Sequence, residues 1–252
     1  MQPILFESSL ITIHWYGVLF AGGFLAAAIH WTWLGSRLGL PRGLGVELCV
    51  WVIVGGVVGA RTAFVLANWN VFSEDPGLIL QINRGGMIYY GGFMGASLAA
   101  LLLAAIRRLP LRLMADYGIT GVPLGHAIGR IGCFMNGCCY GAVHDGWWAV
   151  RLGSDWRYPV PLLETTLNLA IYVVLLQVML RRHRQGRVFA MYMMLYPATR
   201  FGLEFLRGDE RLTGLWLNAA QELSLIFIAF GAVFWIFLPK QRHSVRSHGC
   251  GI

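Results

Sequence analysis

Apolar blocks of roughly 17 to 25 residues recur along the chain, and short clusters of arginine separate them. A helix of this length crosses the roughly 30 Å hydrocarbon core of a bilayer. Only 13% of the residues are charged, about half of the share that is typical of a soluble domain. These features exclude an ordinary soluble globule and predict an all-α, polytopic membrane protein.

We predict seven transmembrane helices in a single integral membrane domain that covers residues 1–252. The longest stretch outside the membrane, about 135–161, is expected to form a small extracytoplasmic cap. Glycine pairs such as Gly55-Gly56 and Gly91-Gly92 are expected to allow close contact between helices in lipid. The predicted helices cover residues 11–34, 47–67, 87–106, 115–134, 162–180, 188–206 and 217–238.

The distribution of cations predicts the orientation of the chain. Twelve of the twenty Lys and Arg residues lie in one set of alternating loops, and ten of the twelve acids lie on the opposite side. The positive-inside rule therefore places the N-terminus outside and the C-terminus in the cytoplasm. The first block lacks the basic flank and cleavage site of a signal peptide, so we expect it to stay in the membrane. The twelve cations are Arg37, Arg42, Arg107, Arg108, Arg112, Arg181, Arg182, Arg184, Arg187, Lys240, Arg242 and Arg246.

The net charge of +8 is explained by this topology signal. A nucleic-acid-binding protein gathers its cations on one basic face, whereas these cations are scattered over loops. We therefore expect no nucleic-acid partner.

Four arginines fall at membrane depth in the outer half of the predicted helices: Arg61, Arg130, Arg200 and Arg207. Charged groups are costly there and usually face the interior of a bundle at a functional site. On a helix, Arg200, Glu204 and Arg207 would share one face. This face is either an ion-pair ladder that stabilises the bundle or a surplus of guanidinium groups that binds a phosphate. In a membrane that phosphate would belong to a phospholipid head group, in a site open toward the outer leaflet.

Two further clusters contain polar or flexible residues near predicted helix ends. In residues 84–92, Gly91 and Gly92 follow a tyrosine pair, a pattern that fits either a close approach of the backbone to a ligand or a tight turn into the helix. His14 and Tyr16 are either proton carriers or part of an interfacial aromatic belt.

Cys133, Cys138 and Cys139 lie close together in the sequence. Structural zinc sites favour two separate pairs of ligands, which this chain lacks, so we expect no metal and no cofactor. His126 and His144 could complete a metal site. In an oxidising compartment, two of the three cysteines could instead form a disulfide.

Six motifs occur in order along nearly the whole chain. They are His14-Trp15-Tyr16-Gly17, Gly59-Ala60-Arg61, Arg84-Gly85-Gly86-Met87 with Gly91-Gly92, Gly129-Arg130-Ile131-Gly132 with Asn136-Gly137 and Gly141, Arg200-Phe201-Gly202-Leu203-Glu204-Phe205-Leu206-Arg207, and Gln221 in the last predicted helix. Together with the predicted topology, this order resembles the bacterial prolipoprotein diacylglyceryl transferase family.

The resemblance implies a multi-pass enzyme of the bacterial cytoplasmic (inner) membrane. Such enzymes transfer the diacylglyceryl group of phosphatidylglycerol to the lipobox cysteine thiol of a secreted preprolipoprotein and release glycerol phosphate. Arg130 and Arg200 match essential arginines of the family and would stabilise the leaving phosphate. One bundle could enclose the site, so a monomer would suffice. The resemblance implies a substrate-binding set of Tyr16, Arg61, Gly91, Gly92, Asn136, Glu204, Arg207 and Gln221.

The chain departs from the usual family pattern at several positions. Tyr90 stands where a histidine, the proposed general base, is usual. The unperturbed pKa of a tyrosine is near 10, so either Tyr90 only positions the phosphate, or His14 or the leaving phosphate takes the proton. Cys133 replaces the usual asparagine and Cys138 the usual acid, while Glu164 is retained. These departures leave the identity of the acceptor open.

Three alternative functions remain at this point. One is a phospholipid-binding homologue that uses another acceptor. An anion transporter would also use the arginines, but such proteins usually contain internal repeats, which this sequence lacks. An intramembrane protease could use Ser97 and His126, but it would leave the four arginines unexplained.

Overall fold

The computed structural model describes residues 4–7, 12–82, 85–152, 154–181, 183–208 and 217–238. In these ranges, seven helices contain at least 18 residues, and each coincides with one predicted transmembrane helix to within a few residues. A short helix α3 (Trp69–Glu74) and a 3₁₀ helix η1 (Pro76–Leu80) follow the second of them. The long helices are α1 (Trp15–Leu38), α2 (Leu44–Ala67), α4 (Tyr89–Ile106), α5 (Leu111–Asn136), α6 (Val160–Leu180), α7 (Arg187–Glu204) and α8 (Ala219–Ile236).

Five of the described helices are long and apolar enough to cross a membrane: α1, α2, α4, α6 and α8. The other two long helices, α5 and α7, do not reach that hydropathy because they contain several charged and polar residues. Examples are Asp116, His126 and Arg130 in α5 and Arg200 in α7. The five apolar helices support the prediction of a helical membrane protein.

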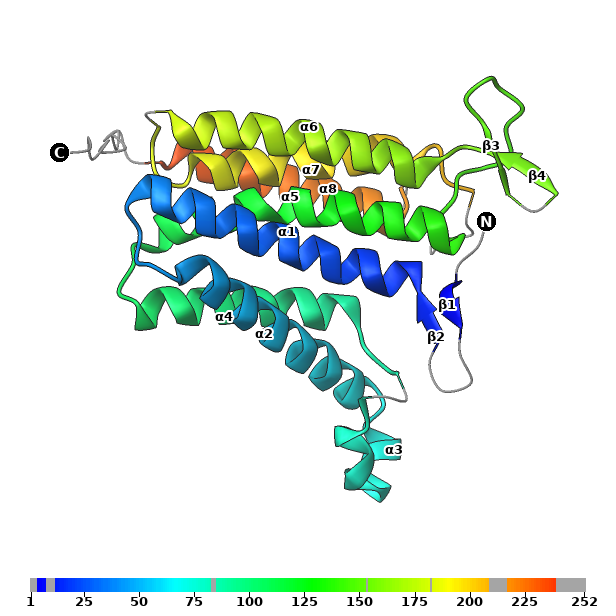
Figure 1. Cartoon of the computed structure of the whole chain (residues 1–252), viewed down its shortest axis with the longest axis horizontal. Coiled ribbons are helices and arrows are strands. Elements are labelled where there is room, and N and C mark those ends of the chain that lie inside the picture. The colour runs from blue at the N-terminus through cyan, green and yellow to red at the C-terminus, as the bar shows by residue number, and fades with distance from the viewer. Residues whose placement is uncertain are drawn as a thin grey trace.

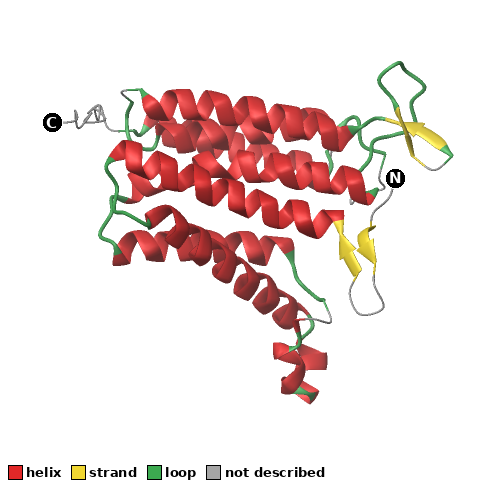
Figure 2. Ribbon diagram, in the orientation of Figure 1, coloured by secondary structure: helices red, strands yellow, loops and turns green. Residues whose placement is uncertain are grey.

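The long helices form a bundle in which α1, α5, α6, α7 and α8 run side by side, with α2 and α4 packed as a separate pair (Figure 1). Two short antiparallel hairpins lie at one end of the bundle (Figure 2). They are β1 (Ile4–Glu7) with β2 (Thr12–His14), and β3 (Val150–Leu152) with β4 (Asp155–Arg157). The all-α prediction omitted these hairpins, because strands of three or four residues are too short to show a hydropathy period.

Glycines form the contact between α2 and α4. A Cβ atom added to Gly95 would overlap the carbonyl oxygen of Gly55, and one added to Gly59 would overlap the carbonyl oxygen of Gly91. The two backbones therefore touch directly, as small residues permit between helices in lipid. This confirms the expectation that the glycine pairs allow close helix contact.

Asp116 fixes the start of α7 from the neighbouring helix α5. Its fully buried carboxylate accepts hydrogen bonds from the backbone N–H groups of Gly186 at 2.6 Å and Phe189 at 2.8 Å. These N–H groups have no partner within the helix, so a carboxylate at this position acts as a cap. His183 Nε2 lies 3.4 Å from the same carboxylate.

The pKa of His183 is raised by this arrangement. Burial lowers its pKa, but the hydrogen bonds with Asp116 and with the Arg181 carbonyl outweigh burial, and the nearby Arg187 opposes them. A raised pKa in the folded state stabilises the fold at pH values below the unfolded pKa of about 6.5, and this stabilisation is lost as the pH rises through the folded value.

We therefore expect the thermal unfolding temperature of the detergent-solubilised protein to fall between about pH 6 and pH 8 through this pair. The His183→Gln variant should show a smaller fall over the same range. Scanning calorimetry of both proteins in a series of buffers measures the difference. Equal pH slopes in the two proteins would contradict this assignment.

A second prediction concerns the glycine contact. Gly95→Ala should destabilise the protein by about 1–3 kcal/mol, because the added methyl group overlaps backbone atoms of α2. Gly118→Ala in α5 is the matched control, since its Cβ would lie 3.7 Å from Leu48 Cδ2, an ordinary contact. There, the higher helix propensity of alanine should leave stability unchanged or raised. Thermal unfolding of both variants measures the difference in stability. Equal effects would contradict the glycine contact between α2 and α4.

Candidate active site

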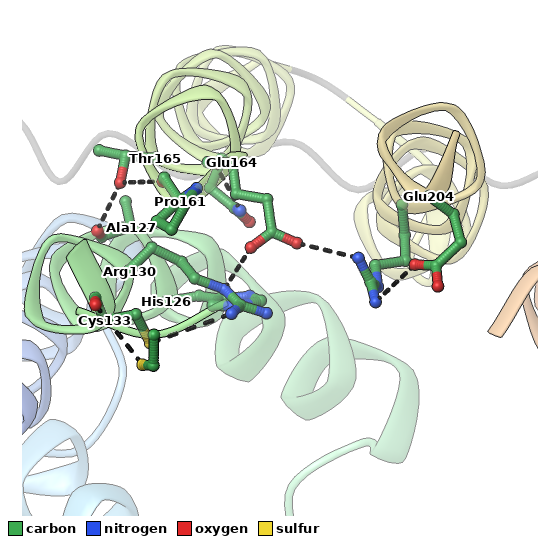
Figure 3. Close-up of polar contacts among 11 residues, drawn as sticks. His126, Ala127, Arg130, Cys133, Pro161, Glu164, Thr165 and Glu204 are labelled. Carbon is green, nitrogen blue, oxygen red and sulfur yellow. Dashed lines mark hydrogen bonds and ion pairs between the residues drawn. The ribbon is translucent and has the colours of Figure 1, made fainter. Parts of the chain in front are cut away.

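Two arginines and two glutamates alternate along a buried line that joins α5, α6 and α7 (Figure 3). Arg130 Nε lies 2.5 Å from Glu164 Oε2, Glu164 Oε1 lies 3.3 Å from Arg200 Nη1, and Arg200 Nη2 lies 2.8 Å from Glu204 Oε2. The side chains of Glu164 and Glu204 are 3% and 1% exposed. We call these four residues the charge chain. Each carboxylate in it compensates a buried guanidinium, which an apolar bundle requires.

Backbone contacts hold Glu164 opposite Arg130. Thr165, the next residue on α6, donates its hydroxyl to the carbonyl of Ala127 on α5 at 3.1 Å and to that of Pro161 at 3.0 Å. This clamp lies one turn before Arg130 on α5, so the facing residues of the two helices are fixed in register.

The charge chain continues to the start of α8. Asn218 donates from Nδ2 to Glu204 Oε1 at 3.1 Å, and its own side chain caps α8 in a capping box with Gln221. A capping box satisfies backbone N–H groups at a helix start from both residues. Gln221, one of the predicted substrate-binding residues, is thus linked to Arg200 through Asn218 and Glu204, and it fixes the residue that contacts Glu204.

Arg130 has two further neighbours on its own helix. Its Nε donates to His126 Nε2 at 3.1 Å, and its Nη1 lies 4.0 Å from Cys133 Sγ. Because His126 Nε2 accepts from an arginine, this nitrogen is not available to a serine. Ser97, the other half of the protease hypothesis, donates to the carbonyl of Phe93 on its own helix at 2.8 Å. The arrangement therefore gives the protease hypothesis no support.

Arg207 does not share a helical face with Arg200, contrary to the prediction. Helix α7 ends at Glu204, and the chain beyond it tightens into a turn in which Arg207 N donates to the Glu204 carbonyl at 3.3 Å. The backbone of Arg207 then pairs with Gly141, and its side chain hydrogen-bonds to Cys139. The predicted spacing of i and i+4 between Arg200 and Glu204 is confirmed.

Arg61 serves a separate part of the molecule. Its guanidinium donates to the main-chain carbonyls of Leu78 at 2.6 Å, Ile79 at 2.9 Å and Gly85 at 2.8 Å, with longer bonds to Gln81 and Gly86. These bonds hold η1 and the turn before α4 against α2. We interpret Arg61 as a support of the site's surroundings, since its donors are used by the backbone.

The tyrosine pair begins α4. Tyr89 lies within electrostatic range of both Arg130 and Arg200. Tyr90 contacts Tyr89 edge to face, with ring centroids 5.8 Å apart, and is 62% exposed. His14 is exposed at the end of β2. In the described parts of the chain, no hydrogen bond or ion pair joins Tyr90 or His14 to the charge chain. Of the same motif, Arg84 lies outside the described residues.

Three cysteines meet beside Arg130. The Sγ atoms of Cys133, Cys138 and Cys139 lie within 4.8 Å of one another, and all three are free thiols. We call them the thiol triad. The hydrogen bond with Cys133 lowers the pKa of Cys139, and burial opposes this effect. Tyr16 lies within electrostatic range of all three cysteines, and its Cδ2 would be 3.5 Å from a Cβ atom added to Gly132, the residue before Cys133.

Asn136, the last residue of α5, hydrogen-bonds to Cys138. The predicted head-group ligands Tyr16 and Asn136 therefore both lie at the thiol triad, one turn beyond Arg130. Gly91, also predicted to bind substrate, packs on α2.

A sequence model of the prolipoprotein diacylglyceryl transferase family matches residues 3–237. The chain belongs to this family. Three relatives named phosphatidylglycerol–prolipoprotein diacylglyceryl transferase illustrate the similarity. The protein of Chromohalobacter salexigens is 33% identical, with 96% of this chain and 94% of the relative covered. Those of Clostridioides difficile and Nostoc are each 30% identical, with 96% and 95% of this chain and 97% and 90% of the relative covered.

The structure adds residues that the sequence analysis did not assign to the site of this transferase-family member. Glu164 lies between the two arginines, and Asn218, Tyr89 and His126 surround them. The signal for Glu164 was present, since it is an acid in the first turns of an otherwise uncharged predicted helix. Tyr89 and Asn218 carry no comparable signal.

Removal of the Glu164 charge tests the charge chain. Glu164→Gln should lower stability by about 3–5 kcal/mol, because Arg130 loses its carboxylate partner and Arg200 keeps only Glu204. The matched control is Glu47→Gln, which breaks the exposed 2.7 Å pair with Arg107 and should cost about 0–1 kcal/mol. Thermal unfolding in detergent measures both. A loss for Glu164→Gln no larger than that of the control would show that the pair contributes nothing.

Proposed function

We propose that this protein transfers the diacylglyceryl group of phosphatidylglycerol to the lipobox cysteine thiol of a preprolipoprotein and releases glycerol phosphate. Membership of the family over residues 3–237 supports this assignment. The single observation that carries it is the pairing of Arg130 and Arg200 on the same carboxylate, Glu164. Two guanidinium groups fixed side by side suit one phosphate.

The reaction forms one bond and breaks one. The sulfur of the acceptor attacks the glycerol carbon that bears the phosphate ester, an S–C bond forms, and the C–O bond to the phosphate breaks. Negative charge grows on the leaving phosphate, where Arg130 and Arg200 would stabilise it. Arg130 contacts Glu164 and His126 through Nε and Cys133 through Nη1. In the described chain no hydrogen bond uses its other terminal amino group, Nη2, which would donate to the phosphate. Glu164 and Glu204 would keep both arginines in place.

The topology that we propose includes α5 and α7 as membrane-spanning helices, seven in all, with the N-terminus outside and the C-terminus in the cytoplasm. Arg130 lies near the end of α5, Glu164 near the start of α6 and Glu204 at the end of α7. All three therefore belong to the end of the bundle where the β3–β4 hairpin connects α5 with α6. The active site would open toward the outer leaflet of the bacterial cytoplasmic membrane, within a single chain.

The experiment mixes the purified protein with phosphatidylglycerol and a lipobox peptide. We expect release of glycerol phosphate and a gain of one diacylglyceryl group in the mass of the peptide. Arg130→Gln should lower the rate by about 10²-fold or more, since a donor to the developing charge is lost. Arg107→Gln, at the opposite end of the bundle, is the matched control and should keep its activity.

A peptide with serine in place of the lipobox cysteine should give no product. If phosphatidylglycerol binds in a manner that depends on Arg130 but the cysteine peptide is never modified, the acceptor in this proposal is wrong. If glycerol phosphate is released equally by Arg130→Gln, the proposed role of the arginine is wrong.

A further inference from the structure

The turn after α5 brings three sulfur atoms to one point. Cys133 lies in the last turn of α5, and Gly137, with φ of +76°, ends the helix. The backbone N–H of Cys138 then donates to the Cys133 carbonyl at 3.1 Å, so the chain folds back on itself. Cys139 has φ of +64°, a conformation that residues other than glycine rarely adopt. Such a conformation is kept where the surrounding structure requires it, often at a functional site.

The distances between the sulfur atoms fit a metal ion. Tetrahedral zinc binds thiolates at about 2.3 Å, which places neighbouring sulfur atoms about 3.8 Å apart. The sulfur atoms of the thiol triad lie within 4.8 Å of one another, so a shift of roughly an ångström completes the coordination. In the described chain, the triad is joined by no fourth His, Cys, Asp or Glu. Structural zinc sites have four protein ligands, whereas three ligands and one open position are typical of catalytic zinc.

The neighbours of the thiol triad suit the charge of such a site. Three thiolates around Zn²⁺ carry a net charge of −1. Arg130 Nη1 lies 4.0 Å from Cys133 Sγ on one side, and Arg207 hydrogen-bonds to Cys139 on the other. Cations beside a thiolate stabilise it. His144 does not belong to this cluster of possible ligands, and its ring stacks on Tyr158 with centroids 4.0 Å apart.

We infer that Cys133, Cys138 and Cys139 bind Zn²⁺ and that its open position takes the acceptor thiol of the incoming peptide. This inference rests on the proposed function, in which the acceptor is a cysteine. A thiol coordinated to zinc is deprotonated outright, and the thiolate is the nucleophilic form. The site would thus supply the nucleophile next to the arginine that holds the leaving phosphate.

The atoms of this step balance. The acceptor thiol displaces a zinc-bound water, and its proton passes to solvent as the zinc–sulfur bond forms. The bound sulfur attacks the glycerol carbon, the S–C bond forms, and the C–O bond breaks with its electron pair on the phosphate. The product thioether carries no charge, is a weaker ligand than a thiolate and leaves the zinc. No oxidant or reductant is involved.

The residues around Arg130 explain why a metal would be needed. His126 Nε2 accepts a hydrogen bond from Arg130 and so does not face an incoming thiol as a free base. Tyr90 and His14 make no hydrogen bond or ion pair with the charge chain in the described parts of the structure. The thiol triad, in contrast, contacts Arg130 through Cys133 Sγ, which lies 4.0 Å from Nη1.

Metal analysis of the full-length protein in detergent tests the site directly. We expect about one zinc per chain after gel filtration, as in other catalytic zinc sites. Replacement by Co²⁺ should give sulfur-to-cobalt charge-transfer bands and the visible spectrum of tetrahedral cobalt. Cys138→Ser should lose both signals. Cys49→Ser is the matched control, since Cys49 lies apart on α2 and contacts the Phe24 carbonyl, and it should keep both.

The acceptor position has its own readout. A lipobox peptide should change the visible spectrum of the cobalt protein, and the same peptide with serine in place of cysteine should not. In the transfer assay, removal of zinc by a chelator should lower the rate by about 10²-fold or more, because deprotonation of the thiol is lost. Added Zn²⁺ should restore it.

The outcomes separate this inference from the proposed function. Full transfer by the zinc-free protein and by Cys138→Ser would overturn the zinc site and leave the transferase standing. A protein without zinc that has lost two titratable thiols would mean a disulfide and would also overturn it. A cobalt spectrum that responds to neither peptide would overturn the acceptor position. A spectrum that responds only to the cysteine peptide, without any transfer from phosphatidylglycerol, would support the zinc site and contradict the proposed function.

Discussion

The ion pairs that Glu164 makes with Arg130 and Arg200 are the interaction on which the end of the bundle beside the β3–β4 hairpin depends. Two guanidinium groups in an apolar bundle cannot stay charged without a partner, and an arginine cannot be deprotonated. A single carboxylate on α6 therefore fixes α5 and α7 relative to each other. The charged residues of this network lower the hydropathy of α5 and α7, which are the least apolar of the seven long helices described.

The two ends of the bundle use buried charge in different ways. At one end, the Asp116 carboxylate accepts hydrogen bonds from the backbone N–H groups that begin α7 and lies beside His183. These partners give Asp116 a structural role. At the other end, Arg130 contacts Glu164 through Nε and Cys133 through Nη1, and in the described chain no hydrogen bond uses its Nη2. A buried charge whose donors are only partly used is what a binding site for an anion needs, because binding then completes the hydrogen bonds.

The sequence was sufficient for the features that depend on local pattern. Helix positions follow from apolar length, the Arg200–Glu204 pair from helical spacing, and the capacity for close helix packing from paired glycines. It was insufficient wherever partners come from different helices, because spacing along one helix does not say how its neighbours are rotated. The place of Glu164 between two arginines is of this kind. The misplaced Arg207 has another cause, since the last turn of α7 tightens and changes the direction of the side chains that follow.

The thiol triad shows how little the sequence says about irregular backbone. Cys133 and Cys138 have the spacing of one pair of zinc ligands, but the sequence supplies no second pair. A helix end, a glycine and one left-handed residue nevertheless gather all three sulfur atoms. Arg130 and Cys133 are three residues apart on α5, so they are neighbours on one face. A displacement at carbon needs the nucleophile and the leaving group on opposite sides of the reacting atom. One helix turn that presents a thiolate site and a phosphate-binding arginine would hold the nucleophile and the leaving group, with the glycerol carbon between them.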